Sequence, residues 1–259
     1  MTKNNPIAYV LLKTAVSPNM VQLAETLRAR HPDLAVDAPT QAGPVLKCSG
    51  MLVAVMSIEA PLPFDEALVT RASATWPGAG VAFQACTAHL VVAVMGRQDH
   101  PLAAARATTA VVEGLLSVVP ESLVVVWNGA VALPAQIWAD LGQAAFAPYP
   151  RFPSRLWVSL HFFRDTRTGG VGVVTHGLRG FVDRELELVS VAGDLDLVTA
   201  WADTLATYLI EKGPVLEDGS TFGVSEAERI PVRLCESERF EGLPVISALL
   251  AETGTPRSG

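Results

Sequence analysis

The sequence predicts an α+β protein, an α/β sandwich of mixed, largely antiparallel sheets with helices on one face. Three observations predict this class. Half of the 259 residues are hydrophobic and 17% are charged, which is a composition that folds around a core. Strand-sized apolar runs such as Met51–Ile58 recur along the chain, and capped segments with helical spacing separate them. Because hairpins alternate with crossover helices, two ferredoxin-like halves are the arrangement that we expect.

Residues 1–147 are expected to form an N-terminal α/β lobe that opens with a strand at Ile7–Lys13. Ser17 and Pro18 suit the N-cap and first turn of a helix that continues to Arg30. Asp65 suits the N-cap of a second helix, which Pro77 ends. The elements expected after the first helix are a hairpin of strands 45–47 and 51–58, a helix at 65–76, a strand at 88–95, a helix at 99–118, a strand at 123–127 and a helix at 134–141.

The boundary is expected in the proline-rich stretch 146–154, so that residues 148–259 form a C-terminal lobe packed with the first as one unit. Gly169-Gly170 predicts a hairpin turn, and Asp194 predicts the N-cap of a long helix. Ser225 and Glu228 have the spacing of a capping box. The elements expected here are strands at 155–163, 171–175, 186–190 and 230–234, a loop at 178–182 and a helix at 194–212.

Composition excludes several functional classes. Lys and Arg number 19 and Asp and Glu number 26, which gives a net charge of −7 and no basic run for a nucleic acid. A membrane span needs about 20 mostly apolar residues, and the apolar stretch Leu102–Val119 is interrupted by Arg106, Glu113 and several Thr and Ser. The N-terminus has no signal-peptide pattern, and Cys48, Cys86 and Cys235 are odd in number and far apart. We therefore expect a cytoplasmic protein without membrane or nucleic-acid partners.

Catalytic and cofactor motifs are also missing from the sequence. The histidines are scattered, and no spacing resembles a zinc site, so we expect no metal and no cofactor. There is no G-x-S-x-G elbow and no phosphate-binding loop. Gly170-Val171-Gly172 begins like a dinucleotide motif, but Thr175 stands where the third glycine belongs. The cysteines at 48 and 86 lie beside strands, where a thiol usually acts as a small apolar group.

Several segments of the C-terminal half carry a family resemblance. The motif Thr175-His176-Gly177-Leu178 with Arg184-Glu185-Leu186-Glu187, the stretch Tyr208–Gly219, and Ser225-Glu226 with Ile230-Pro231-Val232-Arg233 resemble the family called domain of unknown function 4261. The resemblance extends from about Val126 to Arg233. The family has no established activity, and a bacterial toxin–immunity setting, including type VI secretion, is what the resemblance implies.

The candidate site residues lie mainly in the second lobe. His161, His176 and Glu185 are candidate acid–base groups, each with an ordinary structural role as the alternative. Trp127 is a candidate for lining a pocket, with a core position at the end of its strand as the alternative. The candidate binding residues are Trp127, His176, Arg179, Glu185, Glu187, Asp218 and Glu226.

Three functions remain open from the sequence. The first is a non-enzymatic binding protein with a protein partner, in the form of an immunity protein that neutralises a bacterial toxin or secreted effector. The second is an enzyme with a dispersed site of His161, His176 and Glu185 or Glu187. The third is a small-molecule sensor.

Overall fold

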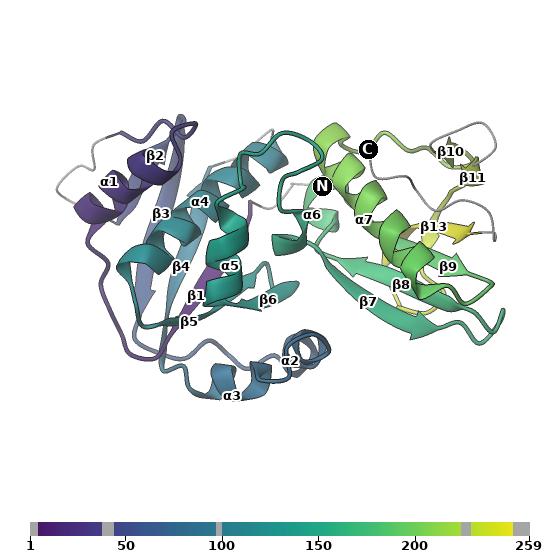
Figure 1. Ribbon diagram of the computed structural model, residues 1–259, viewed down its shortest axis with the longest axis horizontal. Coiled ribbons are helices and arrows are strands. Elements are labelled where there is room, and N and C mark those ends of the chain that lie inside the picture. Colours follow the sequence, from purple (N-terminus) through teal and green to yellow (C-terminus); the bar gives the residue numbers. More distant parts are fainter. Residues whose placement is uncertain (1–4, 38–43, 97–99, 224–228, 251–259) are drawn as a thin grey trace. The chain divides into compact units, whose positions relative to one another are not determined.

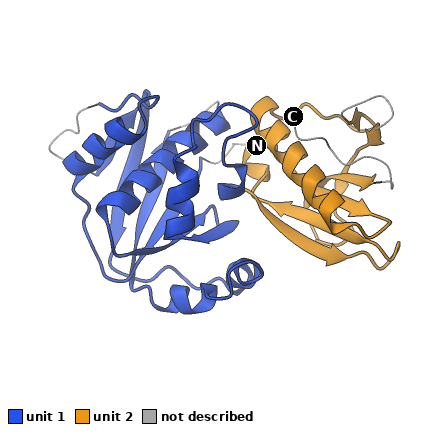
Figure 2. Ribbon diagram, in the orientation of Figure 1, with its two compact units in different colours: residues 1–157 blue, residues 158–259 orange. Residues whose placement is uncertain are grey.

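The computed structural model describes residues 5–37, 44–96, 100–223 and 229–250. The chain divides into two compact units, Met1–Trp157 and Val158–Gly259 (Figure 2). The division follows Trp157, whereas the sequence analysis placed it between residues 147 and 148. The proline-rich segment belongs to the first unit because the Phe152 ring stacks on Trp157 at 5.7 Å and Trp157 Nε1–H donates to Thr109 Oγ1 at 2.8 Å.

The first unit contains a six-stranded sheet in which every neighbouring pair is antiparallel. The strands follow the order β2-β3-β4-β1-β5-β6 (Figure 1). Their bounds are β1 (Ile7–Leu12), β2 (Val45–Cys48), β3 (Met51–Ile58), β4 (Ala88–Met95), β5 (Ser122–Trp127) and β6 (Val131–Pro134). The helices are α1 (Met20–Arg30), α2 (Glu66–Ser73), α3 (Ala79–Gln84), α4 (Pro101–Val118), α5 (Ala135–Gly142) and the single-turn helix Ser154–Leu156.

A ferredoxin-like core lies inside this sheet, as expected. The elements β1, α1, β3, β4, α4 and β5 occur in this order along the chain, with β2 inserted before β3 and α2 and α3 before β4. Their strands have the spatial order β3-β4-β1-β5. Helices α1 and α4 pack together, and α4 contacts β4, β1 and β3. Helix α4 suits this buried position because almost all of its residues are apolar or small, from Ala104 to Leu115. The strands β2 and β6 extend the core at its two edges.

The first sheet differs from the expectation in having helices on both faces. Strand residues alternate between faces, so Val10 and Leu11 point in opposite directions, and both are buried. Helices α2 and α3 contribute Leu68 and Ala79 to a cluster that contains Leu11 and Val124. They therefore cover the face opposite α1 and α4, along β1, β5 and β6. Along β3 and β4 the same face exposes Leu52, Met56, Ile58 and Met95 in the described part of the chain.

The starts of two helices were predicted correctly from their N-cap aspartates. Asp65 Oδ1 accepts a hydrogen bond from the Leu68 N–H at 3.0 Å, and Asp194 Oδ1 accepts one from the Leu197 N–H at 2.9 Å, as N-caps do. The first helix is capped by Asn19, two residues later than the predicted Ser17. The predicted capping box at residues 225–228 lies outside the described residues.

The second unit is a five-stranded sheet in the order β12-β13-β9-β8-β7, with a separate two-stranded ribbon. All pairs are antiparallel except β13 and β9, which are parallel because helix α7 crosses between them. The bounds are β7 (Ser159–Arg164), β8 (Val171–His176), α6 (Arg179–Val182), β9 (Glu185–Ser190), α7 (Leu195–Lys212), β10 (Thr221–Phe222), β11 (Ile230–Pro231), β12 (Arg233–Glu236) and β13 (Pro244–Leu250).

This topology corrects the expectation of two ferredoxin-like halves, since the second unit begins with the meander β7-β8-β9 and ends with a parallel pair. The strand β13 was not predicted. Helix α7 packs on β8 and β9, which covers one face of the sheet. The other face carries His161, His176 and Glu187.

Candidate functional site

The two candidate histidines of the second unit lie on one face of the β7–β8 hairpin. In this antiparallel pair His161 stands opposite Val174 and His176 opposite Ser159, so the two imidazoles are diagonal neighbours. Their ring centroids are 6.0 Å apart. The Phe240 ring, from the loop between β12 and β13, lies 6.0 Å from His161 and 6.4 Å from His176. The fold therefore brings together two predicted residues and one that was not predicted.

Glu185, the third acid–base candidate, is buried and fully engaged in a structural role. One carboxylate oxygen accepts hydrogen bonds from the Gly177 N–H at 2.9 Å and the Arg179 N–H at 3.3 Å. The other accepts from the Thr175 hydroxyl at 2.6 Å and the Leu178 N–H at 3.1 Å. Burial raises the pKa of Glu185, and these four hydrogen bonds oppose the rise. The carboxylate holds the turn after β8 in place and is not available to a substrate.

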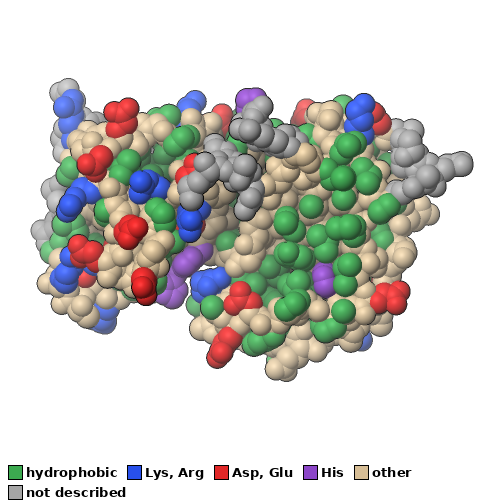
Figure 3. Space-filling model, turned by 180° about the vertical axis from the view of Figure 1, so that it is seen from behind, with side chains coloured by type: hydrophobic (Ala, Val, Ile, Leu, Met, Phe, Trp, Pro, Cys, Tyr) green, Lys and Arg blue, Asp and Glu red, His purple; other side chains and the backbone are tan. Residues whose placement is uncertain are grey.

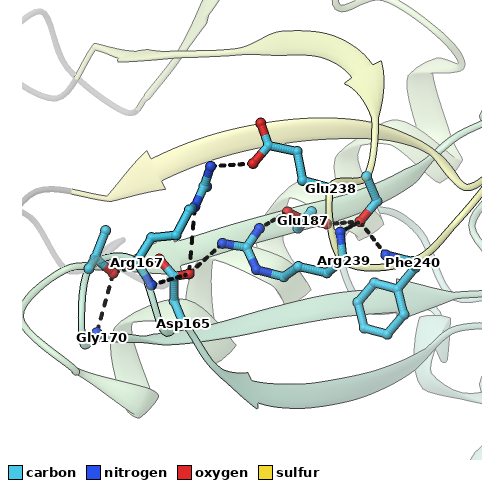
Figure 4. Close-up of polar contacts among 9 residues, drawn as sticks. Asp165, Arg167, Gly170, Glu187, Glu238, Arg239 and Phe240 are labelled. Carbon is cyan, nitrogen blue, oxygen red and sulfur yellow. Dashed lines mark hydrogen bonds and ion pairs between the residues drawn. The ribbon is translucent and has the colours of Figure 1, made fainter.

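Glu187 and Asp165 are joined by Arg239, which the sequence analysis did not select (Figure 4). The guanidinium donates to Asp165 Oδ1 at 2.6 Å through Nη2 and to Glu187 Oε1 through Nη1. It also lies over the Phe163 ring, at 4.8 Å from the centroid. The Ser237 hydroxyl donates to the other oxygen of Glu187. Both carboxylates are buried, so pairing with this single arginine offsets part of the cost of holding two negative charges inside the protein.

The outer part of the same network is more exposed. The Thr168 hydroxyl donates to Asp165 Oδ2 at 2.6 Å, and Arg167 pairs with Glu238 at the surface. The hydrogen bonds from Thr168 and Arg239 hold the pKa of Asp165 well below its ordinary range. Burial lowers the pKa of Arg239, but the two carboxylates outweigh it and raise that pKa above its ordinary value. The network fixes the loop between β12 and β13 to the sheet.

The remaining binding candidates are dispersed. Trp127 is buried in the first unit, 5.9 Å from Trp138 between ring centroids. Arg179 is exposed on α6. Asp218 accepts a hydrogen bond from the Leu234 N–H at 2.8 Å, which closes the edge of β12. Glu226 lies outside the described residues.

The thiols that were weighed as nucleophiles are unsuited to that role. Cys48 and Cys86 are buried, and burial raises the pKa of each thiol to about 11, with Asp37 contributing at Cys48. A thiol with so high a pKa is almost wholly protonated near neutral pH, and the thiolate is the reactive form. Both act as small core residues.

A buried ion pair in the first unit was also missed. Glu113 of helix α4 is fully buried, and its carboxylate meets His31 Nε2 at 3.1 Å and the guanidinium of Arg30. The signal in the sequence was a glutamate within a largely apolar helix. The pair ties the end of α1 to α4.

Part of the first sheet exposes apolar side chains. On the face that α2 and α3 cover only in part, β3 presents Leu52, Met56 and Ile58, which are 45%, 44% and 38% exposed. Met95 of β4 lies opposite Leu52 and is 48% exposed. Apolar side chains gather on this face in the right half of Figure 3. We call this surface the open face; its apolar members are Ile7, Tyr9, Leu52, Ala54, Met56, Ile58, Val91, Ala93 and Met95, and the buried His89, opposite Ile58, lies on the same side of the sheet.

Charge is divided unevenly between the units. Residues 1–157 contain ten Lys and Arg and ten Asp and Glu, whereas residues 158–259 contain nine and sixteen. Among strands β1, β2, β3 and β4, the only Lys, Arg, Asp or Glu side chain is Lys47 of β2, which stands opposite Leu52. The whole net charge of −7 therefore belongs to the second unit, and the open face belongs to a neutral one.

Within the described residues, no cluster of three or more His, Cys, Asp or Glu side chains could hold a metal ion. In the same part of the chain, no helix combines the length and the apolar content that a membrane crossing requires.

Comparison with known proteins confirms the resemblance of the C-terminal part. Residues 174–247 match the family model described as domain of unknown function (DUF4261). The match begins at the end of β8 and extends through the Arg239 loop into β13. No curated protein and no solved structure matches the chain.

Proposed function

We propose that this protein is a non-enzymatic binding protein and that the open face of its first unit is the surface that contacts a protein partner. The observation that carries the proposal is the exposure of Leu52, Met56, Ile58 and Met95 on adjacent strands. Soluble proteins rarely leave contiguous apolar side chains in water unless that surface meets a partner. Sheets also bury such faces by packing against another layer.

The polar groups of the second unit support the same proposal. Glu185 accepts four hydrogen bonds from its own turn, and Glu187 and Asp165 are both paired with Arg239. A general acid or base needs a free oxygen within reach of a substrate. The oxygens of these three carboxylates already accept hydrogen bonds from the protein itself.

The partner class that we propose is a bacterial toxin or secreted effector, which the protein neutralises by covering its active site. The excess of sixteen acidic over nine basic residues in 158–259 supports a basic partner, because opposite charge accelerates encounter. The neutral open face supports an apolar contact at short range. In this proposal the charge acts on the rate of association and the apolar contact on its duration.

The experiment uses the purified product of the gene adjacent to this one as the ligand. Wild-type chain should bind it, and the double variant Leu52→Lys with Met56→Lys should bind it at least about tenfold more weakly. Val21→Lys is the matched control, since Val21 is 57% exposed on helix α1, away from the open face. Absence of binding by the wild type would remove the proposed partner class. Equal binding by the double variant would remove the open face as the contact.

Catalysis by the histidine pair is a second candidate, supported by the 6.0 Å separation of the His161 and His176 rings. An imidazole can exchange protons near neutral pH. If an activity is found by substrate screening, His161→Ala and His176→Ala should each reduce it strongly. An unchanged rate in both variants would exclude this pair.

A further inference from the structure

The edges of the two sheets are protected to different degrees. Along β2, the Asp37 N–H donates to the Lys47 carbonyl at 3.0 Å, and Val36 forms a bridge with Cys48. At β12, Asp218 accepts from the Leu234 N–H. The strand β6 has four residues and ends at Pro134. Short strands, prolines and covering segments are the usual means of preventing edge-to-edge pairing.

The fourth edge, β7, has none of these protections among the described residues. It is six residues long, contains no proline and has the sequence Ser-Leu-His-Phe-Phe-Arg. Its side chains include Phe162, which is 42% exposed. An exposed edge strand of this length is a template for another strand.

The backbone groups that face outward from β7 can be assigned from the hairpin. The Asp165 N–H donates to the Gly170 carbonyl at 3.0 Å, so this pair is a hydrogen-bonded one. Bonded and non-bonded pairs alternate along an antiparallel ladder. The N–H and C=O groups of Leu160, Phe162 and Arg164 therefore point away from β8. No hydrogen bond from a described residue reaches them.

We propose that two copies of this chain pair through β7, antiparallel and related by a two-fold axis at Phe162. The three outward residues are symmetric about Phe162, so one register matches Phe162 with Phe162 of the second copy and Leu160 with Arg164 of the second copy. Each pair then exchanges both of its backbone hydrogen bonds. The two Arg164 side chains lie at opposite ends of the paired strands, so they do not repel each other. Residues 159–164 contain no Asp or Glu, so no acidic side chains meet at this edge either.

The pairing joins two five-stranded sheets into one continuous sheet. It places two exposed Phe162 rings side by side, where cross-strand aromatic pairs stabilise antiparallel sheets. An interface of this kind is isologous, with the same residues on both sides. The inference is independent of the open face, which lies in the first unit.

The first test is the mass of the chain in solution, measured by light scattering after size-exclusion chromatography at about 10–100 µM. The wild type should have twice the mass of one chain. Phe162→Lys should be monomeric, because it places two ammonium groups at the two-fold axis. Met56→Lys on the open face is the control and should remain dimeric. A monomeric wild type, or a dimer that Phe162→Lys leaves intact and Met56→Lys dissociates, would overturn the proposal.

A cross-linking experiment tests the register. In a Cys235→Ser background, Phe162→Cys should form an intermolecular disulfide on mild oxidation, because hydrogen-bonded pairs have Cα atoms about 5.5 Å apart. Leu160→Cys is the matched control, since in this register the two Leu160 Cα atoms are about 14 Å apart. Efficient linking at 160, or equal linking at both positions, would contradict the register.

Discussion

Replacement of Arg239 by methionine should be among the most destabilising single substitutions in the second unit. The side chains of Asp165 and Glu187 are 1% and 3% exposed, and that of Arg239 is 18% exposed. Methionine keeps an apolar stem against the Phe163 ring but removes the guanidinium from both carboxylates, which leaves Asp165 only the more distant Arg167 at 3.9 Å. Breaking a buried ion pair by removal of one partner costs about 3–5 kcal/mol.

Urea unfolding at pH 7, followed by circular dichroism, measures this loss as a change in the free energy of unfolding. A triple variant, Arg239→Met with Asp165→Asn and Glu187→Gln, separates the charge from the packing. Because the triple variant has no charge left at these three positions, it should recover at least about half of the lost free energy of unfolding. Arg239→Lys should be intermediate, since an ammonium cannot bond both carboxylates in the geometry of the guanidinium fork.

The loss should also depend on pH. In the wild type the pKa of Asp165 lies below its unfolded value, so its contribution is present above the unfolded pKa and is lost as the pH falls through the folded pKa. In the Arg239→Met chain the unpaired carboxylates bind protons more readily. The difference between the two proteins should therefore shrink as the pH is lowered from about 6 to about 3. A loss below about 1 kcal/mol at pH 7, or one that grows in acid, would refute this reasoning.

Three further predictions concern stability and thiol reactivity. Glu185→Gln should lower the free energy of unfolding in urea by about 1–3 kcal/mol, because an amide N–H₂ then faces backbone or hydroxyl donors whose hydrogen bonds the carboxylate accepted. An unchanged urea midpoint would contradict the structural role assigned to Glu185. Gly170→Ala should cost at least about 1–3 kcal/mol, since its Cβ would lie 2.0 Å from a backbone carbonyl oxygen of the neighbouring strand; a neutral effect would show that the turn can move. A thiol reagent at pH 8 should modify Cys235 in the native protein and leave Cys48 and Cys86 unmodified until the chain unfolds; rapid reaction of all three would contradict their burial.

Local signals in the sequence predicted the elements whose structure depends on neighbouring residues. The caps Asp65 and Asp194 bind their own first turns, and the Gly169-Gly170 turn makes the β7–β8 hairpin. That hairpin, once its register is known, places His161 near His176. The α+β class and the ferredoxin-like core follow from the same alternation of hairpins and helices.

Contacts between distant residues could not be predicted in this way. Arg239 reaches Asp165 across 74 positions, and nothing near either residue indicates the other. The strand Pro244–Leu250 pairs in parallel with β9, so its place depends on the crossover of α7 and not on a turn. Glu185 was selected as an acid–base group because its local sequence does not show that a turn encloses its carboxylate.

The heat-capacity change of binding to the product of the adjacent gene tests the central claim most directly. Titration calorimetry at several temperatures measures it, and burial of apolar surface makes it negative. The wild type should show a clearly negative heat-capacity change, which the Leu52→Lys, Met56→Lys double variant largely loses. A value near zero for the wild type, or the same negative value for the double variant, would contradict the role of the open face.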